Sequence, residues 1–130
     1  MVESQMTHPV DVLIVDDSSA IRKIVQRMLR QTEMAIGSVY EAGDGIEAIA
    51  VLKDKQVSLI FSDINMPNMS GLEFLKEVRA HEAWKVIPIV MITTEGSQAS
   101  VMEALDLGAV GYVRKPFTPA QITDTLVGLF

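Results

Sequence analysis

The chain has 130 residues, of which 48% are hydrophobic and 22% charged, and it contains no cysteine. This is about one domain's length, and the composition excludes a disordered chain, a collagen-like repeat, a disulfide scaffold and a zinc–thiolate site. The 11 Lys and Arg against 17 Asp and Glu give a net charge of −6, which disfavours nucleic-acid binding. With neither a signal-peptide pattern nor an apolar run near the roughly 18 residues of a membrane span, we expect a cytoplasmic protein.

Short apolar and β-branched runs predict the strands of a sheet, and several are almost continuously apolar. Continuous apolar runs are typical of parallel strands that are covered on both faces. In chain order, the predicted strands are 11–15, 38–42, 57–61, 87–92 and 111–114.

Between these runs the apolar period lengthens toward 3.6 residues, which predicts amphipathic helices. Their starts carry capping residues, a capping box and a proline suited to the first helical position. A glycine at the usual C-terminal position ends the fourth helix. In chain order, the helices are expected after Ser18 and Ser19, from near Asp44, from Ser70, from about Ser97 to Gly108 and from Thr118.

Five strands that alternate with five helices predict an α/β fold, a doubly wound parallel sheet with helices on both faces. The sequence shows no linker, repeat or low-complexity segment between these elements. We therefore expect residues 1–130 to form one domain, in which residues 1–8 are a mobile N-terminal extension.

Several polar side chains fall at the carboxyl ends of the predicted strands, where ligands bind in such sheets. They are Asp16, Asp17, Asp63, Thr93 and Lys115. Each alone is more often a turn or capping residue, but together they place three carboxylates, a hydroxyl and an ammonium on one rim. Crowded carboxylates need a cation, and oxygen ligands favour magnesium. A carboxylate beside magnesium and lysine predicts phosphoryl transfer, and the lack of a glycine-rich phosphate loop argues against a nucleotide donor.

These residues belong to motifs that resemble those of response regulator receiver domains of the stand-alone chemotaxis (CheY-like) type. The resemblance covers residues 9–130 and implies a flavodoxin-like fold with five parallel strands in the order 2-1-3-4-5. The motifs are Asp16-Asp17, Glu41–Gly45, Ser62–Pro67 with Gly71, Thr93 and Lys115–Phe117.

The resemblance implies a phosphoacceptor and a magnesium site. Asp63 would be the nucleophile that accepts a phosphoryl group from a phosphohistidine. Asp17 and Asp63 would supply carboxylates to the magnesium ion, Asp16 would position a metal-bound water, and Asn65 would lend its backbone carbonyl.

It also implies the residues that respond to phosphorylation. Lys115 would pair with the phosphoryl oxygens, and Thr93 would hydrogen-bond to one of them. Tyr112 would be the aromatic switch that moves inward behind Thr93. The bond between Lys115 and Pro116 is expected to be cis.

The function implied is a single-domain response regulator of two-component signalling, most simply in chemotaxis. It would switch the face made by the fourth helix, fifth strand and fifth helix, as a phosphoacceptor with self-catalysed phosphotransfer and autodephosphorylation rather than an enzyme. The implied partners are a histidine kinase, a downstream protein such as a flagellar motor or sensory component, and a phosphatase. We expect a monomer that neither binds nucleic acid nor inserts into a membrane.

Three alternatives remain. A phosphorelay shuttle or a phosphate sink would use the same residues without an output of its own. A haloacid dehalogenase-type phosphatase also uses an aspartate nucleophile, but it needs Asp-x-Asp after the first strand, where this chain has Asp16-Asp17-Ser18. A pseudo-receiver scaffold usually lacks one of the acids or the lysine.

Three aromatic residues are expected outside this site. His8 and His81 have no partner at a metal-binding or catalytic spacing, so we expect plain surface residues. Trp84 lies between the third helix and the fourth strand and is expected at the amino end of that strand, away from the polar rim.

Overall fold

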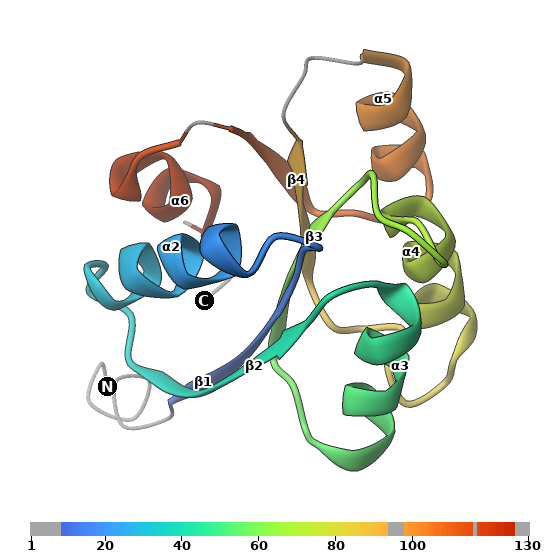
Figure 1. Cartoon of the computed structure of the whole chain (residues 1–130), viewed down its shortest axis with the longest axis horizontal. Coiled ribbons are helices and arrows are strands. Elements are labelled where there is room, and N and C mark those ends of the chain that lie inside the picture. Colours follow the sequence, from blue (N-terminus) through green and yellow to red (C-terminus); the bar gives the residue numbers. More distant parts are fainter. Residues whose placement is uncertain (1–8, 94–97, 116, 127–130) are drawn as a thin grey trace.

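The computed structural model describes residues 9–93, 98–115 and 117–126. Within them a single parallel sheet has the order β2-β1-β3-β4-β5, which confirms the expected fold and strand order (Figure 1). Its strands are β1 (Val10–Val15), β2 (Ile36–Ala42), β3 (Leu59–Asp63), β4 (Ile89–Thr93) and β5 (Gly111–Arg114).

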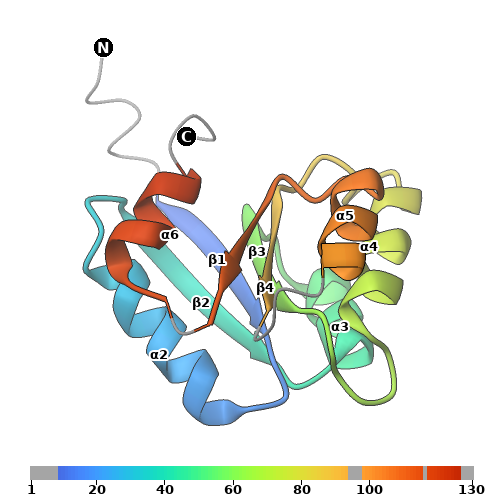
Figure 2. The ribbon, with the colours of Figure 1, turned by 90° about the horizontal axis from the view of Figure 1, so that it is seen from above.

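Helices cover both faces of this sheet, as Figure 2 shows: α2 and α6 lie on one side, and α3, α4 and α5 on the other. The helices are α2 (Ser19–Arg30), α3 (Gly45–Asp54), α4 (Gly71–Ala80), α5 (Gln98–Asp106) and α6 (Pro119–Leu126). In the described part of the chain, none of them has both the length and the apolarity needed to cross a bilayer.

Two hydrophobic cores lie between the sheet and its helix layers. Alternate residues of β1 serve the two sides, with Leu13 in the core under α3 and α4 and Ile14 in the core under α2 and α6. Because successive side chains of a strand point to opposite faces, a strand that feeds both cores must be apolar throughout. The central strands therefore read as continuous apolar runs.

Three of the predicted helix starts are confirmed in detail, whereas the predicted start at Ser97 lies outside the described residues. Ser18 caps α2, and Asp44 caps α3 through its side chain. The capping box before α4 is complete, since Ser70 accepts from the Glu73 backbone N–H and the Glu73 carboxylate accepts from the Ser70 N–H. Each side-chain cap satisfies a backbone donor that the helix itself leaves unpaired.

Some strand limits differ from the prediction. β3 begins at Leu59 rather than 57 and continues beyond Phe61 through the polar Ser62 and Asp63, because β4 pairs with both of them. β4 begins at Ile89 rather than 87, since Pro88 has no N–H to donate to a neighbouring strand. The extension of β3 places Asp63 at the very end of a buried strand.

Candidate functional site

Three aspartates gather at the carboxyl edge of the sheet. Asp16 and Asp17 follow β1, and Asp63 ends β3, the strand that lies beside β1. One carboxylate oxygen from each of the three lies within 4.8 Å of the other two. Asp16 and Asp63 are buried, whereas Asp17 is exposed at the surface. The predicted convergence of the three side chains is thus what the fold produces.

Every polar atom of Asp16 has a partner. Its N–H donates to the Ala42 carbonyl at 3.0 Å, and its own carbonyl accepts from Arg22 Nη1 at 2.6 Å. One carboxylate oxygen accepts from the Ser18 N–H at 2.9 Å, and the other forms an ion pair with Lys115 Nζ at 2.7 Å. Asp16 is consequently held as firmly as a core residue, although it carries a charge.

Asp63 is less well compensated. One carboxylate oxygen accepts from the Ile64 N–H at 2.8 Å, and the other lies 3.5 Å from Lys115 Nζ. Burial raises the pKa of Asp63; the Lys115 charge opposes this shift, and the neighbouring Asp16 carboxylate adds to it. An ionised Asp63 in this position therefore calls for an additional positive charge.

The donor set suits a hard divalent cation. The cluster offers three carboxylates, and Asn65 lies exposed in the bend directly after β3. Oxygen ligands without histidine or cysteine are those that magnesium prefers. Asp16, Asp17 and Asp63 are the residues that would hold the ion.

The loop between β3 and α4 is fixed by contacts to neighbouring elements. Gly71, the first residue of α4, donates its N–H to the Ile64 carbonyl at 2.8 Å. Asn68 has a positive φ of 66° and donates its side-chain amide to the Asp44 carboxylate at 2.7 Å. This hydrogen bond lowers the pKa of Asp44. The loop that carries Asn65 thus has a defined path beside Asp63.

The remaining predicted residues are only partly described. Thr93 ends β4 at the same edge of the sheet, but its side chain lies outside the described part of the structure. Tyr112 lies on β5 with 48% of its surface exposed. The expected cis bond concerns Pro116, and the N-terminal extension with His8 covers residues 1–8; both lie outside the described residues.

Sequence reasoning missed Arg22 and Glu41 as parts of this site. Arg22 Nε donates to Glu41 at 2.9 Å while its Nη1 holds the Asp16 carbonyl. The two residues lie 19 positions apart, so no local spacing pattern indicates the pair. The motif that contains Glu41 was the only available signal.

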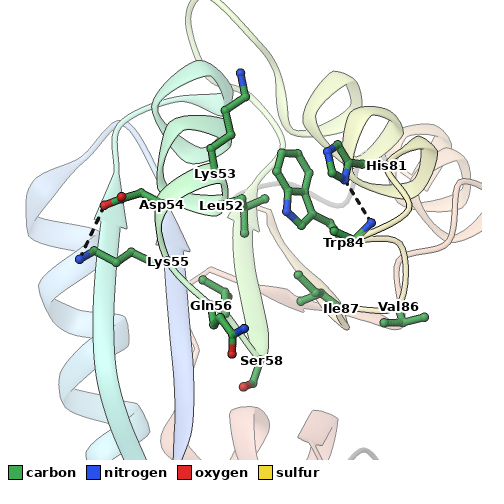
Figure 3. A pocket seen from close by; sticks show the side chains of 12 residues that line it. Leu52, Lys53, Asp54, Lys55, Gln56, Ser58, His81, Trp84, Val86 and Ile87 are labelled. Carbon is green, nitrogen blue, oxygen red and sulfur yellow. Dashed lines mark hydrogen bonds and ion pairs between the residues drawn. The ribbon is translucent and has the colours of Figure 1, made fainter.

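A groove of about 630 Å³ lies at the opposite end of the sheet, between the C-terminal end of α3 and the loop before β4 (Figure 3). Its wall includes Trp84, which is 8% exposed and stacks on His81 with ring centroids 3.7 Å apart. Trp84 therefore lies where the sequence placed it, away from the aspartates. His81 is exposed as expected, with an aromatic partner that the sequence did not indicate.

Because of this separation, the fluorescence of Trp84 should change little when magnesium binds or when Asp63 is phosphorylated. A magnesium titration followed by phosphorylation with acetyl phosphate, monitored by tryptophan emission, checks this. A large quench at either step would mean that the ligand acts at the far end of the sheet.

Comparison with known proteins agrees with this geometry. The family model for the response regulator receiver domain matches residues 12–127. The chain is 37% identical over 129 residues to the chemotaxis protein CheY-3 of Vibrio cholerae, covering 99% of this chain and 98% of that protein. It is 43% identical over 116 residues to the CheY homolog of Campylobacter jejuni, covering 88% of each.

Solved structures give the same result. The chemotaxis response regulator CheY4 of Vibrio cholerae superposes with a TM-score of 0.82 and 39% identity, covering 95% of this chain and all of that one. The fold of this chain, including its parallel sheet, is therefore the fold of a chemotaxis response regulator. The chain belongs to the family of response regulator receiver domains and is of the CheY-like type.

Proposed function

We propose that this protein is a phosphorylation switch of two-component signalling, in which Asp63 accepts a phosphoryl group from the phosphohistidine of a histidine kinase. The observation that carries the proposal is the surroundings of Asp63. Its carboxylate lies within 4.8 Å of Asp16 and Asp17 oxygens and 3.5 Å from the ammonium of Lys115. Three crowded aspartates and a lysine at the carboxyl ends of parallel strands are not needed to stabilise the fold, which favours a chemical role for them.

The chemistry needs a nucleophile and positive charge around the transferred group. A carboxylate oxygen of Asp63 attacks phosphorus, and the bond from phosphorus to the histidine nitrogen breaks, leaving its electron pair on the imidazole. Lys115 forms an ion pair with Asp16 and lies near Asp63, and in the proposed reaction it would bind a phosphoryl oxygen. Bound magnesium would supply further neutralisation of the phosphoryl oxygens.

Exposed apolar side chains support an output surface around α5 and β5. On and beside α5 and β5, large apolar side chains reach the surface: Met102, Leu105, Val110 and Tyr112 are 53%, 37%, 45% and 48% exposed. Exposed apolar residues grouped on adjoining elements are typical of a protein-binding surface. A switch that moves Thr93 and Tyr112 would act on this same face.

The cellular role follows from the relatives. Those named above are chemotaxis proteins of nearly the same length, so we place this protein in chemotaxis signalling in the cytoplasm. Its partners would be a histidine kinase, a phosphatase and a downstream target such as a flagellar motor or sensory component. The protein would act as a monomer, and its product is a conformation rather than a released chemical.

The proposal is tested by labelling. With acetyl phosphate and magnesium, the protein should gain one phosphoryl group that is stable to acid and labile to base, as measured by mass spectrometry. Asp63→Asn keeps the shape but removes the nucleophile, so labelling should be lost completely. Asp54→Asn, which changes an exposed aspartate with 77% side-chain exposure at the end of α3, is the matched control and should label like the wild type. Undiminished labelling of Asp63→Asn would refute the assignment.

A further inference from the structure

The carboxyl end of β2 supplies no carboxylate to the acidic cluster, yet it is tied to it. Glu41, near the end of β2, accepts hydrogen bonds from Arg22 Nε at 2.9 Å and from Lys23 Nζ. The other end of the Arg22 guanidinium donates from Nη1 to the backbone carbonyl of Asp16 at 2.6 Å. Arg22 thus spans the gap between β2 and the loop that carries Asp16 and Asp17.

We propose that Arg22, braced by Glu41, is a positioning residue that orients the two loop carboxylates for the divalent cation and so sets the affinity for it. The Asp16 carbonyl belongs to the peptide unit that joins Asp16 to Asp17. A peptide unit is planar, so a hydrogen bond to its oxygen fixes the direction in which both residues leave it. This inference rests on the proposed function, because it takes the acidic cluster to be a magnesium site.

The contacts around this peptide show why Arg22 matters for Asp17. Asp16 has other fixed partners, since its N–H is held by Ala42 and its carboxylate by Ser18 and Lys115. Asp17 is exposed, and its direction depends on the peptide that precedes it. Arg22 is the side chain that holds this peptide oxygen.

The geometry is one that arginine alone provides. Its planar guanidinium directs donors along two separate lines, one to Glu41 and one to Asp16. The Arg22 and Glu41 side chains are only 18% and 24% exposed, so water competes weakly for these bonds. Lys23 and Arg22 both lower the pKa of Glu41, which keeps the brace ionised. Partners of this kind, one step removed from the metal, orient the ligands.

The positive charge of Arg22 allows a test of this proposal. Arg22→Met removes a cation near a cation site, so charge alone predicts tighter magnesium binding. If Arg22 instead orients the Asp16 and Asp17 carboxylates, its loss should weaken magnesium binding. We expect the dissociation constant for magnesium to rise by about 10-fold. Calorimetric titration of the folded protein with magnesium, without any phosphodonor, measures this directly. The magnesium concentration for half-maximal labelling by acetyl phosphate should shift in the same direction.

Two further variants make the test specific. Arg27→Met removes the same charge from an exposed position later on α2 and should bind magnesium like the wild type or slightly better. Arg22→Lys keeps the charge and most of the stem but cannot reach both acceptors, so it should bind magnesium less tightly than the wild type. Weakened binding in both Arg22 variants, with Arg27→Met unaffected, supports the proposal.

Unchanged or tighter magnesium binding by Arg22→Met would overturn the proposal, even if the melting temperature of that variant fell. If Arg22→Lys bound magnesium with the affinity of the wild type, simultaneous hydrogen bonding of Arg22 to Glu41 and Asp16 would not be what sets that affinity. Failure of the proposed function looks different, because the wild type would then bind magnesium without being labelled on Asp63. The calorimetric comparison keeps its meaning in that case.

Discussion

Replacing Gly71 by alanine is expected to destabilise the protein by about 3 kcal/mol or more and to prevent phosphorylation of Asp63. A Cβ at this position would lie 2.0 Å from the Asp63 carbonyl oxygen and 2.8 Å from the Ile64 Cα. Both are backbone atoms, so no side chain can turn away to make room. The added methyl would have to push α4 away from the end of β3, and the proposed nucleophile Asp63 would move with it.

Gly45→Ala is a closely matched control. Like Gly71, Gly45 is the first residue of a helix that a polar side chain caps. A Cβ there would meet Met69 Cγ at 2.6 Å, Sδ at 2.7 Å and Cβ at 2.9 Å. A change of rotamer can move the Cγ and Sδ atoms, and only a small shift is then needed at the Cβ, so Gly45→Ala should destabilise the protein less than Gly71→Ala. Urea unfolding with and without a phosphodonor measures both variants. If Gly71→Ala unfolds at the same urea concentration as Gly45→Ala and is labelled normally, the backbone of Asp63 and Ile64 does not exclude a Cβ at position 71.

Magnesium should stabilise the folded wild type, because an ion at the proposed site would relieve repulsion among the aspartates, which are brought together only by folding. At ten times its dissociation constant the gain is about 1.4 kcal/mol, which corresponds to a rise in Tm of roughly 3–6 °C. Asp17→Ala removes one ligand and should blunt the rise. Thermal unfolding followed by circular dichroism over a series of magnesium concentrations measures both. Equal shifts in the two proteins would exclude Asp17 as a ligand.

The burial of Asp63 should make the stability of the metal-free protein sensitive to pH. Burial raises the pKa of Asp63, so the folded state holds this proton more tightly than the unfolded chain does. The contribution of Asp63 to stability is therefore fully present below its unfolded pKa of about 3.9 and is lost as the pH rises through the raised folded value. Without magnesium, Asp63→Asn should melt above the wild type at pH 7, and the difference should shrink toward pH 3.

Much of the fold could be predicted from local signals. Continuous apolar runs marked the buried parallel strands, and Ser18, Asp44 and Ser70 marked the helix starts that the structure shows. These signals work because the period of apolar residues and the capping of unpaired N–H groups are properties of a short segment. The strand order came from the resemblance of the motifs, since periodicity within one segment contains no information about its neighbours.

Where the local signals failed, the reason was pairing with another strand. β3 extends through Ser62 and Asp63 although both are polar, because the backbone of β4 continues to pair with them. A polar residue at the end of an apolar run reads as a loop, and only the presence of the adjacent strand makes it part of the sheet. That extension decides the position of the proposed nucleophile.

The sequence by itself determined which acids would meet, since parallel strands bring their carboxyl ends to one edge of the sheet. Only the tertiary structure decided how those acids are held. Arg22 and Glu41 lie 19 positions apart, Asn68 and Asp44 lie 24 apart, and the Cβ-excluding contact of Gly71 is with the backbone of β3. Each of these contacts joins segments that approach one another only after the strands have paired and the helices have packed, so no spacing along the chain could reveal them.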